Sequence, residues 1–235
     1  MNKKDFFTFI VLKLEKYFNA LGFVYKSSYS GFVKQINDGW FAVSFEFYKS
    51  AGLDNFIVGV EIRKNTAQDI LFKYVDIKPA DQKRFPTFSF TLHKLFKEKE
   101  NAYRFETEQE LGDLLDKNLI PFLETQLPYF VEKYSELKNL YLLFSDVSEA
   151  NNRLVWPTYV NYINMLIMGW LLNPQKVTQL VEYCNELFLK LKQKWPEQLD
   201  VELFERDFNS IVQDLIKANG SYEKTGEHWS IHNKK

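Results

Sequence analysis

Two runs of alternating polar and apolar residues, 40–48 and 56–63, form the clearest pattern in the chain. A period of two is typical of antiparallel strands that are buried on one face. Apolar positions are odd-numbered in the first run and even-numbered in the second. Residues opposite each other in paired strands share a face, so the apolar sets meet only if each odd-numbered residue pairs with an even-numbered one. That buried face then carries Phe41, Val43, Phe45, Phe47, Phe56, Val58, Val60 and Ile62. The other face carries Trp40, Ser44, Glu46, Tyr48, Glu61 and Arg63.

An amphipathic helix that ends at Gly22 is expected before these strands. The apolar run 6–12 follows Asp5 and is followed at once by charged residues, with no small-residue cleavage site, so it does not match a secretory signal. The other long apolar run, 165–172, is far short of the roughly 20 residues that a membrane span needs. No membrane segment is expected. The helical apolar positions are Phe6, Ile10, Leu14, Tyr17 and Leu21.

Further strands are expected at 23–26, 29–36, 88–92 and 103–105. Asp38-Gly39 is a strong signal for a two-residue hairpin turn, because both central positions of such a turn need positive φ. This turn would pair Asn37 with Trp40, and therefore Phe32 with Phe45. The strands together predict an antiparallel sheet.

Helical patterns dominate after residue 107, where Thr107 and Glu110 match a capping box. Pro121 and Pro128 should kink or divide the first helical segment, because proline lacks an amide hydrogen and crowds the preceding turn. A nearly all-apolar helix is expected at 158–172, a second from 173, and a third at about 200–218. The fold class is therefore α+β, with an N-terminal helix, an antiparallel β-sheet and a mostly helical C-terminal half.

A polar stretch at 146–153 is the best internal boundary. It separates an α+β sheet domain with closing helices, 1–145, from a helical subdomain, 154–218. Residues 219–235 form a polar tail that we expect to fray.

The net charge limits the possible partners of the protein, and the cysteine content indicates its cellular compartment. Thirty basic and thirty-one acidic residues give a net charge of −1. This balance argues against a nucleic acid or an anionic membrane as a partner that is attracted by the net charge of the protein. The single cysteine, Cys184, lies in an apolar helical row and leaves no disulfide framework within the chain. A cytoplasmic protein is expected.

Three groups of residues were considered for chemistry. Glu46 and Glu61 share a strand face and could act as acid and base, although alternation alone predicts solvated polar residues there. His93 could carry a proton, or it is a lone exposed histidine. His228 and His232, with Glu227, have helical metal-ligand spacing but lie in a polar tail without supporting ligands. We therefore expect no catalytic residue, no cofactor and no metal.

The aromatic content, 17% of the chain, is the broadest functional signal. Trp40 and Tyr48 lie on the polar strand face, and Trp156 lies at the start of the helical half. Exposed rings of this kind often anchor protein interfaces. The alternative is that the helical half covers both sheet faces and that all these rings belong to the core.

One stretch of the chain resembles a known family. The segments Tyr17-Phe-Asn-Ala-Leu-Gly-Phe-Val-Tyr-Lys, Gly31-Phe-Val-Lys, Phe41-Ala-Val-Ser-Phe-Glu-Phe and Phe56-Ile-Val-Gly-Val-Glu-Ile look like the bacterial domain-of-unknown-function 4304 family. Helix 108–122 is similar to the helix that closes that domain. The resemblance covers about residues 5–145 and implies an α+β domain of unassigned activity, with no catalytic residues to carry over.

The sequence thus favours a bacterial, cytoplasmic, non-catalytic protein-binding module. One concrete version is an immunity or antitoxin-like protein that covers part of a partner protein. The alternative is an enzyme of unknown reaction with a site between the sheet and helical halves, using Glu46, Glu61 or His93. The partner, any substrate and the oligomeric state do not follow from the sequence.

Overall fold

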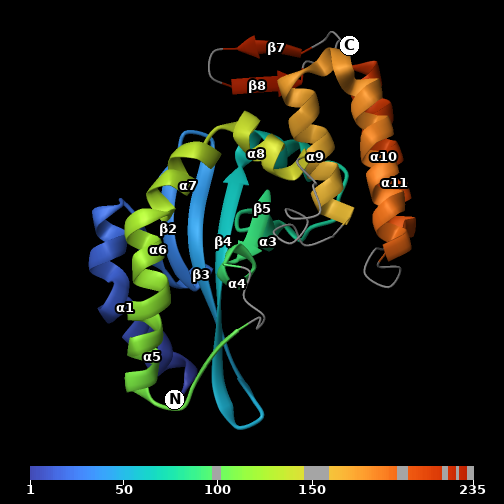
Figure 1. The fold of residues 1–235 in the computed structure, drawn as a ribbon. Coiled ribbons are helices and arrows are strands. Elements are labelled where there is room, and N and C mark those ends of the chain that lie inside the picture. The colour runs from blue at the N-terminus through green and yellow to red at the C-terminus, as the bar shows by residue number, and fades with distance from the viewer. Residues whose placement is uncertain (97–101, 146–158, 195–200, 219–221, 226–227, 232–235) are drawn as a thin grey trace. The chain divides into compact units, whose positions relative to one another are not determined.

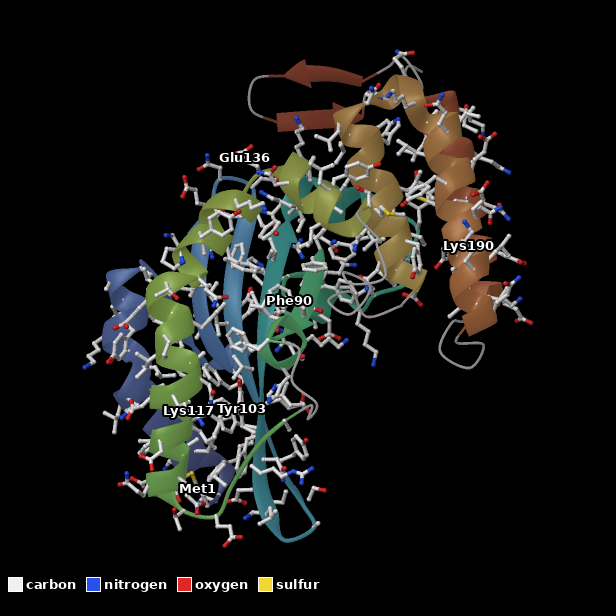
Figure 2. All side chains as sticks on the ribbon, viewed as in Figure 1. Met1, Phe90, Tyr103, Lys117, Glu136 and Lys190 are labelled. Atoms are coloured by element: carbon white, nitrogen blue, oxygen red, sulfur yellow. The ribbon has the colours of Figure 1, made fainter. Side chains whose placement is uncertain are left out.

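The computed structural model describes residues 1–96, 102–145, 159–194, 201–218, 222–225 and 228–231 (Figure 1). The chain forms two compact units. The first, the sheet unit, comprises residues 1–63 and 88–136, and the second, the helical unit, comprises residues 64–87 and 137–235. No helix within the described ranges combines the length and apolar content that crossing a bilayer requires.

The sheet unit begins with helix α1 (Lys3–Ala20), which is capped by the side chain of Asn2 accepting a hydrogen bond from the Asp5 amide at 2.9 Å. Its buried residues are Phe6, Ile10, Leu14 and Phe18. The predicted amphipathic helix is therefore confirmed, with Phe18 in the buried row instead of Tyr17. Gly22 follows with φ 78°, a left-handed conformation that suits glycine at a helix end.

Five strands form the main path of the sheet in the order β1-β2-β3-β4-β5, and β6 also pairs with β4. The pairs β1–β2, β2–β3, β4–β5 and β4–β6 are all antiparallel, as the sequence predicts. The strands are β1 (Val24–Lys26), β2 (Gly31–Ile36), β3 (Gly39–Ser50), β4 (Leu53–Lys64), β5 (Phe88–Thr91) and β6 (Tyr103–Phe105), with a short 3-10 turn, η1 (Ser27–Tyr29), after β1.

The predicted register of the β2–β3 hairpin is wrong by two residues. Ile36 pairs with Gly39, so the turn residues are Asn37 and Asp38, and Phe32 pairs with Val43 instead of Phe45. The positive φ of 124° belongs to Gly39, which starts β3. A shift of two residues keeps each side chain on its predicted face, because side chains alternate with period two.

The predicted buried face is confirmed. Phe41, Val43, Phe45, Val58 and Val60 are each at most 2% exposed. Half-buried Phe47 stacks on Phe6 of α1, with ring centroids 4.8 Å apart. Helices α1 and α6 (Ile120–Thr125) contact each other on this side of the sheet (Figure 1).

The helices of the sheet unit begin near the capping and proline residues that the sequence indicates. Thr107 and Glu110 form the capping box of α5 (Glu108–Leu114). A π-helical turn, η2 (Leu115–Leu119), precedes α6, and a break at Gln126 separates α6 from α7 (Leu127–Tyr134). Pro121 and Pro128 lie in the first turns of α6 and α7. The helix is therefore divided before Pro128, whereas before Pro121 it continues through the π-helical turn without a break. The short α4 (Leu92–Leu95) follows β5.

The helical unit is built around α9 (Tyr159–Leu172), whose side chains from Tyr162 to Leu171 are all buried. Helices in contact with α9 are α2 (Asn65–Leu71), α8 (Leu137–Ser145), α10 (Val177–Lys194) and α11 (Val201–Lys217). A helix that is apolar all round is typical of such a central position. Shorter turns are α3 (Pro79–Gln82) and η4 (Pro174–Lys176).

The predicted boundaries differ from the observed ones in two places. Residues 64–87 and α8 belong to the helical unit, partly because Gln68 of α2 donates a hydrogen bond of 3.1 Å to Asn164 of α9. The tail is not frayed throughout, since β7 (Tyr222–Thr225) and β8 (His228–Ile231) pair as a hairpin. The expected linker 146–153 lies outside the described residues.

Candidate binding surface

Trp40 is not an exposed anchor. Its side chain is 4% exposed and belongs to a buried cluster with Val33 and Ala42. Tyr29 packs against this cluster, and the centroids of the Tyr29 and Trp40 rings are 5.1 Å apart. The register places Val33 opposite Ala42 and Gln35 opposite Trp40, so this is the second face of the sheet. The expectation that Trp40 is an exposed ring is therefore wrong, because the second face is itself partly buried.

The other two predicted contact residues are not supported as anchors. Tyr48 is half-buried on β3, two residues before the end of that strand. Trp156 lies outside the described residues. The second sheet face therefore supplies no exposed ring from this set.

The candidate acid and base residues lie in three different environments. Glu46 is exposed, and half-buried Glu61 accepts a hydrogen bond of 2.5 Å from the Ser44 hydroxyl. Burial raises the pKa of Glu61, and the hydrogen bond from Ser44 opposes that rise. His93 is 1% exposed, and its ring centroid lies 4.0 Å from that of Tyr103 on β6. The expected exposed histidine is thus a buried one.

The helical spacing on which a metal site in the C-terminal tail would depend is not found at His228. His228 begins strand β8, while Glu227 and His232 lie outside the described residues. In the ranges that the structure describes, no group of three or more His, Cys, Asp and Glu side chains is placed to hold a metal ion. Cys184 is fully buried, which raises the pKa of its thiol to about 12.

The structure draws attention to a different surface, on the helical unit, where α8 and α10 approach each other. Gly169 of α9 makes this approach possible. A Cβ atom at Gly169 would lie 2.8 Å from Leu180 of α10 and 2.9 Å from Tyr141 of α8. Since real Cβ contacts are longer, only glycine lets both side chains pack directly on the α9 backbone.

Tyr183 of α10 and Leu142 of α8 are the exposed members of this α8–α10 surface. Tyr183 is 38% exposed and Leu142 is 48% exposed. The Tyr183 hydroxyl donates a hydrogen bond of 2.9 Å to the carbonyl of Ser145, the last residue of α8. This bond fixes the ring, so an aromatic face is presented with its polar atom already satisfied. Half-buried Tyr141 and Leu180, from the same two helices, pack at Gly169.

Sequence reasoning missed this surface because its residues come from two helices that are not adjacent in the chain. One signal was available within α10. The apolar row of that helix runs through Val177, Leu180, Val181, Cys184 and Phe188, and Tyr183 lies off the row. A large ring outside the apolar stripe of an amphipathic helix is a candidate exposed anchor.

Comparison with known proteins gives no further identification. No family model, curated protein or solved structure matches the chain. The resemblance of residues 5–145 to the domain-of-unknown-function 4304 family therefore stays a prediction, and function has to be inferred from the geometry of the chain itself.

Proposed function

We propose that the chain is a non-catalytic module that binds another protein through the α8–α10 surface. The observation that carries the proposal is the Tyr183 ring, which is exposed while its hydroxyl is held by Ser145. A ring fixed in this way loses little conformational freedom when a partner covers it. Tyrosine is also enriched among the residues that contribute most to binding.

Leu142 supports the same proposal. It lies on α8 one turn before Ser145, the residue that accepts the hydrogen bond from Tyr183, and is itself 48% exposed. An exposed aromatic ring and an exposed aliphatic side chain on two helices joined by this hydrogen bond are suited to fill an apolar pocket on a partner. The proposed partner is therefore a protein whose surface presents such a pocket.

The finer parts of the proposal come from the sequence. A cytoplasmic location is proposed from the single cysteine, and an immunity or antitoxin-like role is one form that the binding function could take. The enzyme alternative has less support, because Glu46 is exposed, Glu61 is bonded to Ser44 and His93 is buried beside Tyr103.

Site-specific photo-crosslinking in the native host tests the proposal. Benzoylphenylalanine replaces Tyr183 in one variant and Asn185 in the other. Asn185 is an exposed residue on the same helix, about 200° around the axis from Tyr183. We expect a protein adduct from the variant at 183 and none from the variant at 185. No adduct at 183, or equal adducts at both positions, would count against the surface.

Affinity measurements with the captured protein complete the test. Tyr183→Ser combined with Leu142→Ser should weaken binding by about 30-fold or more, as loss of a dominant contact does. The matched control is Tyr129→Ser on α7, since Tyr129 is another exposed tyrosine, at 55%. Unchanged affinity of the double variant, or equal loss in the Tyr129 variant, would contradict the proposal.

A further inference from the structure

The second face of the sheet carries a carboxyl group whose partners are incomplete. Among the described residues, Ser44 is the one that hydrogen-bonds to Glu61, and its hydroxyl engages Oε1. Burial raises the pKa of Glu61, and the hydrogen bond from Ser44 opposes that rise. No salt bridge to Glu61 is formed within the part of the chain that the structure describes. A half-buried carboxylate without a cation is unusual, since burial of a charge is costly unless the charge is paired.

Glycine at position 59 makes the arrangement possible. A Cβ atom there would lie 2.7 Å from the Ser44 hydroxyl oxygen and 3.6 Å from Oε1 of Glu61. The carboxyl group therefore reaches Ser44 past a position that has no side chain. Isolated glycine inside a strand often marks a place where another group approaches the backbone closely.

Two further hydroxyl groups belong to the same face. The β4–β5 register pairs Glu61 with Ser89 and Gly59 with Thr91. Side chains directly opposite each other on one sheet face have Cβ atoms about 4.5–5.5 Å apart. Ser89 is exposed and Thr91 is half-buried, and both belong to β5, the strand beside β4 on the side away from Ser44.

We infer that Ser44, Glu61, Ser89 and Thr91 form a site for a primary ammonium group, supplied by a lysine side chain of a partner protein. An ammonium group has three donors and no acceptor. The site offers it the free carboxylate oxygen of Glu61 and two hydroxyl oxygens on the neighbouring strand. An anionic or purely apolar group would leave the carboxylate unpaired, and pairing with a cation would offset the cost of its burial.

The source of the lysine rests on the proposed binding function, but the site lies in the other unit and is tested without the partner. The probe is Nα-acetyl-lysine N-methylamide, added to full-length protein with ¹³C-labelled glutamate. The neutral control probe is Nα-acetyl-norleucine N-methylamide, which has the same chain without the ammonium group. We expect a saturable shift of the Glu61 carboxyl resonance with the lysine probe and none with the norleucine probe.

Variants separate binding from a merely structural role. Glu61→Gln should abolish saturable binding of the lysine probe, followed at the amide resonances of β4 and β5. Ser89→Ala should weaken binding by about tenfold, since a hydrogen bond to a charged group is lost. Gln35→Ala, an exposed position on the same face of β2, should leave binding unchanged.

Three results would overturn the inference. Equal shifts with both probes would show that the ammonium group is not recognised. Retained binding in Glu61→Gln would exclude the carboxylate as its partner. Unchanged binding in Ser89→Ala, or an equal loss in Gln35→Ala, would exclude the β5 hydroxyls as part of the site. None of these results bears on crosslinking at Tyr183, so failure of this site and failure of the α8–α10 surface are distinguishable.

Discussion

The hydroxyl of Ser44 on β3 donates a hydrogen bond of 2.5 Å to the carboxyl of Glu61 on β4, past the bare backbone of Gly59. The bond crosses between neighbouring strands on the face that carries most of the polar positions in the sequence pattern. It links a half-buried carboxyl group to a hydroxyl on the neighbouring strand. Three predictions depend on this pair and its surroundings.

Gly59→Ala should destabilise the protein by displacing Ser44, because the new Cβ atom would lie 2.7 Å from the hydroxyl oxygen. In a Ser44→Ala background the same change should cost less, or become favourable by about 0.5–1 kcal/mol through the lower backbone entropy of alanine in the unfolded chain. Urea unfolding of the four proteins in this double-mutant cycle measures the coupling. If the effects of Gly59→Ala and Ser44→Ala on the free energy of unfolding are additive, Gly59 is not required for the Ser44–Glu61 hydrogen bond.

Glu61 should make stability depend on pH. Burial raises the pKa of Glu61 above its ordinary value of 4.5. The stability that this raised pKa gives is fully present below pH 4.5, where Glu61 is protonated. It is lost as the pH rises through the folded-state pKa. Glu61→Gln stays neutral, so its stability relative to the wild type should increase over that window. Urea unfolding between about pH 4 and pH 8 measures the difference.

Ser44→Ala provides the comparison for this pH effect. The Ser44 hydrogen bond lowers the pKa of Glu61, so its removal should move the pH window upward. A stability difference between Glu61→Gln and wild type that is constant with pH, or that decreases as pH rises, would contradict the prediction.

Trp40→Ala should cost about 3–5 kcal/mol of stability, the usual range for truncating a buried tryptophan. The reason is the packing of the indole with Val33, Ala42 and Tyr29 on the second sheet face. Val24→Ala, at a 60% exposed position on β1, should change stability by less than about 0.5 kcal/mol. Thermal or urea unfolding distinguishes the two. A small effect at Trp40 would indicate that its ring is not part of a packed core.

Asn164→Ala should destabilise the helical unit through lost hydrogen bonds. Asn164 accepts from Gln68 at 3.1 Å and donates to the Thr87 carbonyl at 3.2 Å, and all three side chains are fully buried. Each buried group left without a partner costs about 1–3 kcal/mol. Asn185→Ala, at an exposed position on α10, is the control and should have little effect on urea unfolding. Equal effects of the two changes would contradict the prediction.

Local patterns in the sequence were sufficient for the element types and for the buried sheet face. Alternation with opposite parity in β3 and β4 placed Phe45 and Val58 together, because period-two side chains have only two possible faces. The capping box at Thr107 and the proline at 128 indicated helix starts, since these effects act within one turn. These features depend on neighbours a few residues away.

The tertiary structure decided whatever depends on residues that are distant in the chain. The burial of Trp40 depends on packing across two strands and on Tyr29, and alternation alone had placed this residue on a polar face. The α8–α10 surface exists because Gly169, on a third helix, lets Tyr141 and Leu180 pack onto its backbone. The assignment of residues 64–87 to the helical unit likewise depends on Gln68 meeting Asn164. Packing geometry of this kind is not encoded in any local period, so only the folded chain reveals which rings are covered and which are presented.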